Sequence, residues 1–241
     1  MKKDGNVYGN HISQSFNEEL AALKSRFLEM GGLVETQVLQ AVKALTERDA
    51  ELANLVRDED KVVDRYEMKI DDAAIHILAR RQPTARDLRL VVSIIKAVSD
   101  LERIGDESKK IAKLALQLVE GDKTPNGLTE IRHIGQHVAT MLNGALEAFA
   151  RLDVEKAVEI IKEDKNVDAE YKTASRSLMT YMMEDPRTIS ECMSVMWVFR
   201  ALERVGDHAC NLAEHIVYMV EGEDVRHTKI DQLDEQLKRL D

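Results

Sequence analysis

The chain contains an internal repeat, which limits the folds open to it more than any other feature. The pentapeptide Glu102-Arg103-Ile104-Gly105-Asp106 returns as Glu203-Arg204-Val205-Gly206-Asp207, 101 residues later. Each copy lies near the middle of a long stretch in which apolar residues recur at helical spacing. Turn-forming residues interrupt this periodicity at only a few places. The sequence therefore predicts an all-α protein made of two copies of one helical unit.

Turn chemistry divides each copy into three helices. Asp49 and Asp153, 104 residues apart, are suitable N-caps for the second helix of each copy, and Pro83 and Pro186 follow the ends of those helices. The expected helices run from about Phe16 to Thr46, from Asp49 to near Arg81, from Thr84 to about Glu120, through Ile134 to Phe149, from Asp153 to about Glu184 and from about Thr188 to Glu221. The first two helices of the copies align at an offset of 104 residues and the third helices at 101. The second copy therefore lacks three residues before its last helix.

These elements predict two tandem bundles of three antiparallel helices. We place the first repeat, with its polar N-terminal segment, at residues 1–121, the second at 122–223 and a charged tail at 224–241. The long helices should measure about 45 Å. A short linker and broad apolar faces indicate that the two bundles pack into one elongated molecule.

Composition narrows the classes of partner. Aromatic residues make up 4% of the chain, and a net charge of −10 argues against nucleic acid or a polybasic membrane anchor. No apolar run approaches the roughly 20 residues that cross a bilayer, so we expect membrane association only through partners. We also expect no secretory signal in the polar stretch Met1–Asn10. Cys192 and Cys210 lie on one predicted helix, too far apart for a disulfide, which suits a reducing cytoplasm.

The repeated pentapeptide places carboxylates where a core is expected. At 100° per residue, Glu102 and Gly105 continue the apolar line of their helix, with Asp106 beside them, and Glu203 and Gly206 repeat the geometry. An uncompensated inward carboxylate costs several kcal/mol, so it must be protonated, paired with a cation or bound to a metal. A mid-helix glycine costs about 1 kcal/mol, which indicates close approach of a backbone or ligand.

A second acidic repeat faces the first. Asp60 and Asp64 recur as Asp164 and Asp168, and antiparallel helices joined near residue 82 bring Asp64 level with Glu102. The candidate metal ligands are therefore Asp60, Asp64, Glu102, Asp106, Asp164, Asp168, Glu203 and Asp207, with Asp60 and Asp164 furthest from the expected centres. Clusters of oxygen ligands suit Mg²⁺, Mn²⁺ or Ca²⁺ and can hold bridged iron or zinc. The alternative is a solvated helix edge on which arginines and lysines pair with the acids.

Together with Ala79–Thr84 and Asp87-Leu88-Arg89 before the third helix, these motifs resemble the PhoU family from about His11 to His227. The resemblance implies a negative regulator of the phosphate-starvation (Pho) response and a modulator of phosphate uptake. It implies a cytoplasmic protein, peripheral to the inner membrane, that works with the Pst transporter ATPase (PstB) and the sensor kinase PhoR. Family resemblance also implies a homodimer with divalent metal ions (Mg, Mn, Fe or Zn) at the carboxylate motifs.

The two copies differ in ways that limit this inference. Arg86, Asp87 and Arg89 have Arg187, Thr188 and Ser190 near their places in the second copy, so a surface for partners need not be duplicated. His208 occupies the place of Glu107, and we expect it at the surface or behind the metal ligands.

Two other functional classes compete. A ferritin-like oxidase needs Glu-x-x-His on two helices, whereas the chain offers one such motif, Glu130 with His133, away from the acidic clusters. No phosphate-binding loop, nucleophile elbow or HExxH motif is present, so we expect no enzyme, although a carboxylate-bound metal can activate water. The other competitor is a purely structural helical adaptor.

Overall fold

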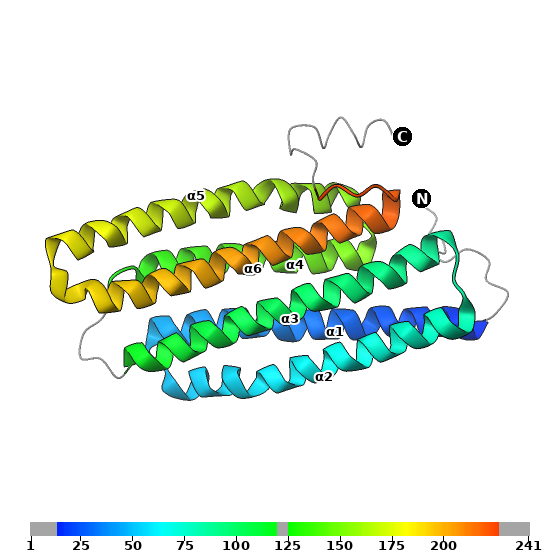
Figure 1. The fold of residues 1–241 in the computed structure, drawn as a ribbon, viewed down its shortest axis with the longest axis horizontal. Helices are drawn as coiled ribbons and strands as arrows, with labels where there is room; N and C mark the ends of the chain where they lie inside the picture. The colour runs from blue at the N-terminus through cyan, green and yellow to red at the C-terminus, as the bar shows by residue number, and fades with distance from the viewer. Residues whose placement is uncertain (1–13, 120–124, 227–241) are drawn as a thin grey trace, which may run out of the picture.

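The computed structural model describes residues 14–119 and 125–226, and this part of the chain is an elongated bundle of six α-helices (Figure 1). The first half contains α1 (Gln14–Glu47), α2 (Ala50–Arg81) and α3 (Ala85–Val119). The second half contains α4 (Leu128–Arg151), α5 (Val154–Glu184), the 3₁₀ helix η1 (Pro186–Thr188) and α6 (Ile189–Glu221). The all-α class and the two three-helix repeats are confirmed. The predicted tail at 224–241 lies almost wholly outside the described residues.

The first turn of each half is a copy of the other. Asp49 and Asp153 each accept a hydrogen bond from the backbone N–H three residues ahead, at 2.9 and 3.0 Å. The preceding residues, Arg48 and Leu152, are left-handed, with φ of 58° and 56°. Both predicted N-caps are therefore confirmed, and the duplication extends to the backbone of the turn.

The second turns differ because three residues are missing from the second half. In the first half α2 ends at Arg81, the next residue, Gln82, has a left-handed backbone, and α3 begins at Ala85. In the second half Asp185 caps the next segment by accepting a hydrogen bond from the backbone N–H of Arg187 at 3.1 Å. Residues 186–188 then form η1 where the first half has the opening turn of α3. The shorter connection is thus accommodated in a tighter helical turn.

The two halves pack through four of the six helices. α3 contacts α6 and α1 contacts α4, whereas α2 contacts only the helices of its own half and α5 only those of the second half. Figure 1 accordingly shows α2 and α5 at opposite edges of the molecule. Gly31 on α1 and Gly135 on α4, equivalent positions of the repeat, make this contact close. A Cβ on Gly31 would lie 2.3 Å from Leu146 Cδ2, and one on Gly135 would lie 2.6 Å from Val42 Cγ2.

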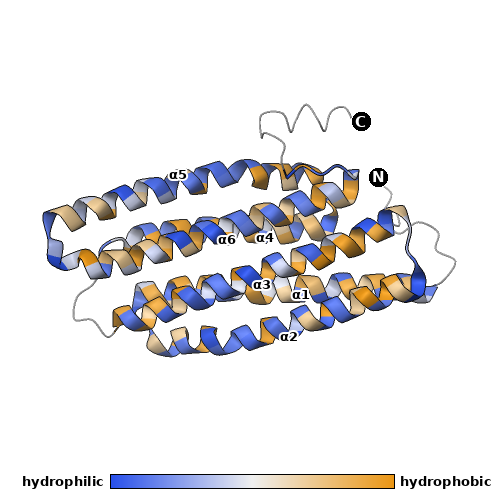
Figure 2. Cartoon of the chain, in the orientation of Figure 1, coloured by the Kyte–Doolittle hydropathy of each residue, from blue (hydrophilic) through white to orange (hydrophobic). Residues whose placement is uncertain are grey.

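One apolar core runs through both halves. Phe27 of α1 and Phe149 of α4 stack across the interface with ring centroids 4.3 Å apart. Every helix in Figure 2 shows both apolar and hydrophilic residues, as expected for helices with one buried face. None of the helices between residues 14 and 226 has the length and apolar content that a membrane crossing requires. Both cysteines are free thiols, as predicted.

Candidate functional site

The first carboxylate cluster, consisting of Asp60, Asp64, Glu102 and Asp106, lies between α2 and α3. Asp60 is buried, with 3% of its surface exposed, and its Oδ1 lies 3.7 Å from the point where a Cβ on Gly105 would stand. That distance is ordinary van der Waals contact, so an alanine side chain would also fit here and close packing alone does not explain the glycine. Glu102 and Asp106 are half-buried and Asp64 is exposed. Asp60 is the most buried of the four, but its charge raises the pKa of Glu102 less than the charges of Asp106 and Asp64 do. Its expected place furthest from the centre stays a prediction.

Burial and, after it, mutual repulsion raise the pKa values of carboxylates in this first cluster. Burial raises the pKa of Glu102, and the charges of Asp106 and Asp64 raise it further. The pKa of Glu67 is raised in the same way, first by burial and then by Glu102. Glu67 is thus a fifth carboxylate of this region that the repeat did not indicate. Its counterpart 104 residues later is a tyrosine, so a comparison of the two copies could not find it.

One lysine and one amide modify the cluster. Lys109 of α3 donates a hydrogen bond to Asp60 Oδ2, and this bond raises the pKa of the ammonium group. Gln37 of α1 is buried, and its Oε1 lies 3.4 Å from the Cβ position of Gly105. That oxygen has no hydrogen-bond partner among the described residues. The region therefore holds five carboxylates, one of them paired with Lys109, and one unsatisfied amide oxygen.

The second carboxylate cluster, consisting of Asp164, Asp168, Glu203 and Asp207, lies between α5 and α6. Glu203 is buried, with 8% of its surface exposed, as the helical phase predicted. Its Oε1 accepts a hydrogen bond from Arg200, while no described residue contacts Oε2 by a hydrogen bond. Burial, followed by the charges of Asp207 and Asp168, raises the pKa of Asp164 to about 6. Like the first cluster, this one has one buried, two half-buried and one exposed carboxylate, and it holds one unsatisfied carboxylate oxygen.

The donor chemistry of both clusters fits a hard divalent cation. Acidic side chains from two facing helices lie near one another, and Glu203 Oε2 and Gln37 Oε1 are buried without partners among the described residues. Burial and like charge raise the pKa values of Glu102, Asp164 and Glu203. Across residues 14–119 and 125–226, however, no three His, Cys, Asp or Glu side chains are already arranged to hold a metal ion. Lysine and arginine side chains occupy some of the oxygens instead, so a cation would have to displace them.

A buried polar network joins α3 to α6 between the clusters. Asp100 Oδ1 accepts hydrogen bonds from Asn211 Nδ2 at 3.0 Å and lies 2.9 Å from His208 Nδ1, while Oδ2 lies 3.0 Å from His215 Nε2. Burial alone would raise the pKa of Asp100, but the hydrogen bonds from His208, His215 and Asn211 outweigh it and hold the pKa well below its usual range. The surface position expected for His208 is wrong, because the imidazole is buried beside Asp100.

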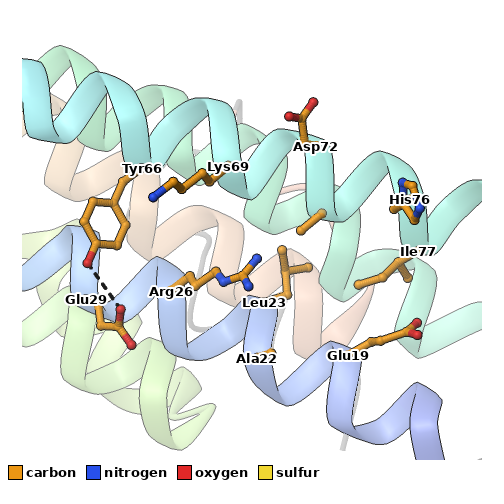
Figure 3. A pocket seen from close by; sticks show the side chains of 11 residues that line it. Glu19, Ala22, Leu23, Arg26, Glu29, Tyr66, Lys69, Asp72, His76 and Ile77 are labelled. Carbon is orange, nitrogen blue, oxygen red and sulfur yellow. Dashed lines mark hydrogen bonds between the residues drawn. The ribbon is translucent and has the colours of Figure 1, made fainter.

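A separate cavity of about 700 Å³ lies between α1 and α2 (Figure 3). Figure 3 shows Arg26 and Lys69 on facing helices, with Tyr66 hydrogen-bonded to Glu29 at 3.4 Å. At the equivalent positions of the second half, a cavity of about 450 Å³ is lined by Glu130, His133, Glu170 and Thr173. Because Glu130 takes the place of Arg26 and Thr173 that of Lys69, the two cavities do not form a duplicated site. His133 lies 3.2 Å from Glu170 Oε1, away from the carboxylate clusters.

Comparison with known proteins identifies relatives along almost the whole chain. The family model described as the PhoU domain matches residues 27–115 and again 131–216. A Pseudomonas putida protein named phosphate-specific transport system accessory protein PhoU homolog is 55% identical over 218 residues, covering 90% of this chain and 85% of the relative. The Escherichia coli phosphate-specific transport system accessory protein PhoU is 45% identical over 231 residues, covering 96% of this chain and 95% of the relative.

Solved structures agree with this match. The crystal structure of PhoU from Pseudomonas aeruginosa has a TM-score of 0.84 and 53% identity, covering 86% of this chain and all of that one. The crystal structure of the phosphate transport system regulatory protein PhoU from Streptococcus pneumoniae has a TM-score of 0.80 and 32% identity, covering 87% of this chain and 99% of that one. Both copies of the repeat therefore match one domain family, and the complete fold matches that of two solved proteins.

Proposed function

The chain belongs to the PhoU family, and from that premise we propose that it is a negative regulator of the phosphate-starvation response and a modulator of phosphate uptake. The observation that carries the proposal is the match to the Escherichia coli accessory protein, which spans 95% or more of both chains. Relatives named as accessory or regulatory proteins support a regulatory role in phosphate transport rather than an enzymatic one.

The proposed partners are the ATPase of the Pst transporter, PstB, and the sensor kinase PhoR. The protein would act as a homodimer in the cytoplasm, peripheral to the inner membrane through these partners. Support comes from the names of the relatives, which place them with a phosphate-specific transport system.

Deletion of the gene tests the regulatory proposal. With phosphate abundant, the deletion strain is expected to express phosphate-starvation genes constitutively, measured with a reporter fused to a starvation promoter. Restoring the chain should restore repression, and the purified chain should retain the transporter ATPase or the kinase in a pull-down. Normal repression in the deletion strain would contradict the proposed function.

We also propose that the two carboxylate clusters bind divalent metal ions. Supporting observations are the acidic side chains that face one another, the raised pKa values of Glu102, Asp164 and Glu203, and the unsatisfied Glu203 Oε2. A bound cation would neutralise the like charges, which lysine and arginine contacts offset only in part. The competing interpretation is a structural adaptor in which Lys109, Lys172 and Arg200 alone balance the acids.

Metal analysis distinguishes these interpretations. After exposure to Mn²⁺, Mg²⁺, Fe²⁺ or Zn²⁺ and removal of free metal, the wild type is expected to retain metal in both clusters. Glu102→Ala with Asp106→Ala should lose the metal of the first cluster only, and Glu203→Ala with Asp207→Ala that of the second. Inductively coupled plasma mass spectrometry measures the metal content of each protein.

A matched control is Glu51→Ala with Glu155→Ala, which removes two exposed acids at equivalent positions of the repeat. This variant should keep the wild-type metal content. A folded wild type that retains no metal after all four exposures contradicts metal binding and favours the adaptor with lysine and arginine partners.

A further inference from the structure

An open groove of about 520 Å³ lies between the C-terminal half of α3 and the N-terminal half of α6. From α3 it is lined by Lys110, Lys113 and Leu114, and from α6 by Trp197, Arg200 and Arg204. Along α3 the lining extends from Glu107 to Gln117, which corresponds to about 15 Å of helix. The groove is therefore long enough to contact a segment of polypeptide over two or three helical turns.

The groove is basic on a strongly acidic protein. Lys110, Lys113, Arg200 and Arg204 line it, against one carboxylate, that of Glu107. Glu107 is buried and lies 2.9 Å from Lys110 Nζ and 2.7 Å from Arg204 Nη1, so it anchors two of the cations from beneath. Since the chain as a whole carries a net charge of −10, this groove reverses the local sign of charge.

The groove also exposes apolar side chains in a regular pattern. Trp197 has 61% of its surface exposed, and the half-buried Leu114 faces it from α3. On α6, Ile189 and Met193 precede Trp197 at intervals of four residues and are 45% and 39% exposed. This spacing places the three side chains along one stripe that leads into the groove. Exposed apolar stripes beside charged residues are typical of surfaces that bind a partner.

The internal repeat provides a comparison that shows how the groove arises. At the 101-residue offset of the repeat, three groove residues have polar counterparts. Ala201 corresponds to Asp100, Lys110 to Asn211 and Leu114 to His215. At the second set of positions the three polar side chains join in hydrogen bonds that close the space between α3 and α6. At the groove, the small Ala201 and Lys110 make no such bond with each other, and the space between α3 and α6 stays open. The groove is therefore a product of particular residues and not of the helix crossing itself.

We propose that this basic groove is a docking site for an acidic amphipathic helical segment of a protein partner. Lys110, Lys113 and Arg204 complement the acidic residues of such a helix, and the apolar stripe complements its apolar face. The fourth cation of the groove, Arg200, also pairs with Glu203 of the second carboxylate cluster. A single phosphate group cannot contact cations spread over two helices and about three turns. The proposal rests on the proposed function, in which the chain binds other proteins, and it adds where the contact is made and what chemistry recognises it.

Fluorescence of Trp197, the single tryptophan of the chain, reports occupancy of the groove without a label. The probe is a synthetic helical peptide with Leu at every third or fourth position and Glu elsewhere. Binding is expected to shift the emission to shorter wavelength in a saturable manner. Lys110→Glu with Lys113→Glu should weaken binding at least about tenfold, because two favourable charge contacts become repulsive.

The control variant Lys43→Glu with Arg151→Glu changes the net charge equally at exposed positions outside the groove, and it should bind the peptide as the wild type does. The same peptide with Lys in place of Glu should produce no shift. An absent shift with the acidic peptide, or equal losses in the two variants, overturns the proposal. The proposal is also overturned if inorganic phosphate or phosphatidylglycerol vesicles, used instead of the peptide, shift the Trp197 emission of the wild type but not of the groove variant.

A second experiment, in cells, distinguishes failure of this inference from failure of the proposed function. In the deletion strain, Lys110→Glu with Lys113→Glu is expected to leave starvation genes expressed in abundant phosphate, while the control variant represses them. Immunoblotting and circular dichroism verify that both variants accumulate and fold. Full repression by the groove variant overturns the groove as a docking site and leaves the proposed function intact. Full repression without any copy of the chain contradicts the proposed function itself.

Discussion

Asp100→Ala is expected to lower the free energy of unfolding by about 3–5 kcal/mol, the range for removing one partner of a buried charged network. The carboxylate is almost fully buried and is the common partner of His208, Asn211 and His215. Its removal leaves three polar side chains at the interface of α3 and α6, and an unsatisfied buried polar group costs about 1–3 kcal/mol. Urea denaturation followed by far-UV circular dichroism measures the loss.

Asp100→Asn provides the graded comparison. The amide keeps the shape and one acceptor oxygen, so a loss of about 1–3 kcal/mol is expected. Asp72→Ala, at an exposed position of α2, should change stability by less than about 0.5 kcal/mol. If the free energy of unfolding of Asp100→Ala lies within about 1 kcal/mol of the wild-type value, the network contributes little to holding the two halves together.

The fold could be predicted because its signals are local. Helical spacing of apolar residues, two aspartate N-caps and two prolines define the ends of the elements, and each acts within a few residues of its own position. The duplication then predicts the tertiary arrangement of one half from the other. The 3₁₀ turn at residues 186–188 is the exception. A three-residue deletion shows that the turn must differ but not which backbone conformation absorbs it.

The carboxylate clusters were predicted in part. Helical phase and the turn near residue 82 correctly bring Asp64 close to Glu102. Burial depends on neighbouring helices as well as on phase, which explains why Glu203 is buried while Glu102 is only half-buried. Whether the clusters bind metal stays a prediction.

Features present in only one copy escaped the sequence argument. Asp100 has Ala201 as its counterpart, so neither the buried network nor the open groove appears as a repeated motif. A lone aspartate between apolar residues could have signalled a buried partner, but its partners lie more than 100 residues away on α6. Helical phase shows which face a residue occupies and does not identify the side chain that meets it across an interface.

Gly135→Ala is expected to lower the free energy of unfolding by about 1–2 kcal/mol, even though alanine favours the helix by about 1 kcal/mol. The added methyl group would lie 2.6 and 2.9 Å from the two Cγ atoms of Val42 and 3.3 Å from its Cβ. A β-branched valine in a helix has one strongly preferred rotamer, so α1 and α4 must separate to relieve the overlap. Thermal and urea denaturation measure the change.

Two variants make the Gly135→Ala result specific. Adding Val42→Ala removes the overlapping atoms, so the double variant should lose less stability than the sum of its single changes, by about 1 kcal/mol or more. Gly32→Ala meets nothing within 4 Å on an exposed part of α1, and it should stabilise the protein by up to about 1 kcal/mol through helix propensity alone. Equal effects of Gly135→Ala and Gly32→Ala would mean that α1 and α4 do not pack closely in solution. The two halves would then be held together mainly by α3 and α6, and Asp100→Ala would be expected to separate them.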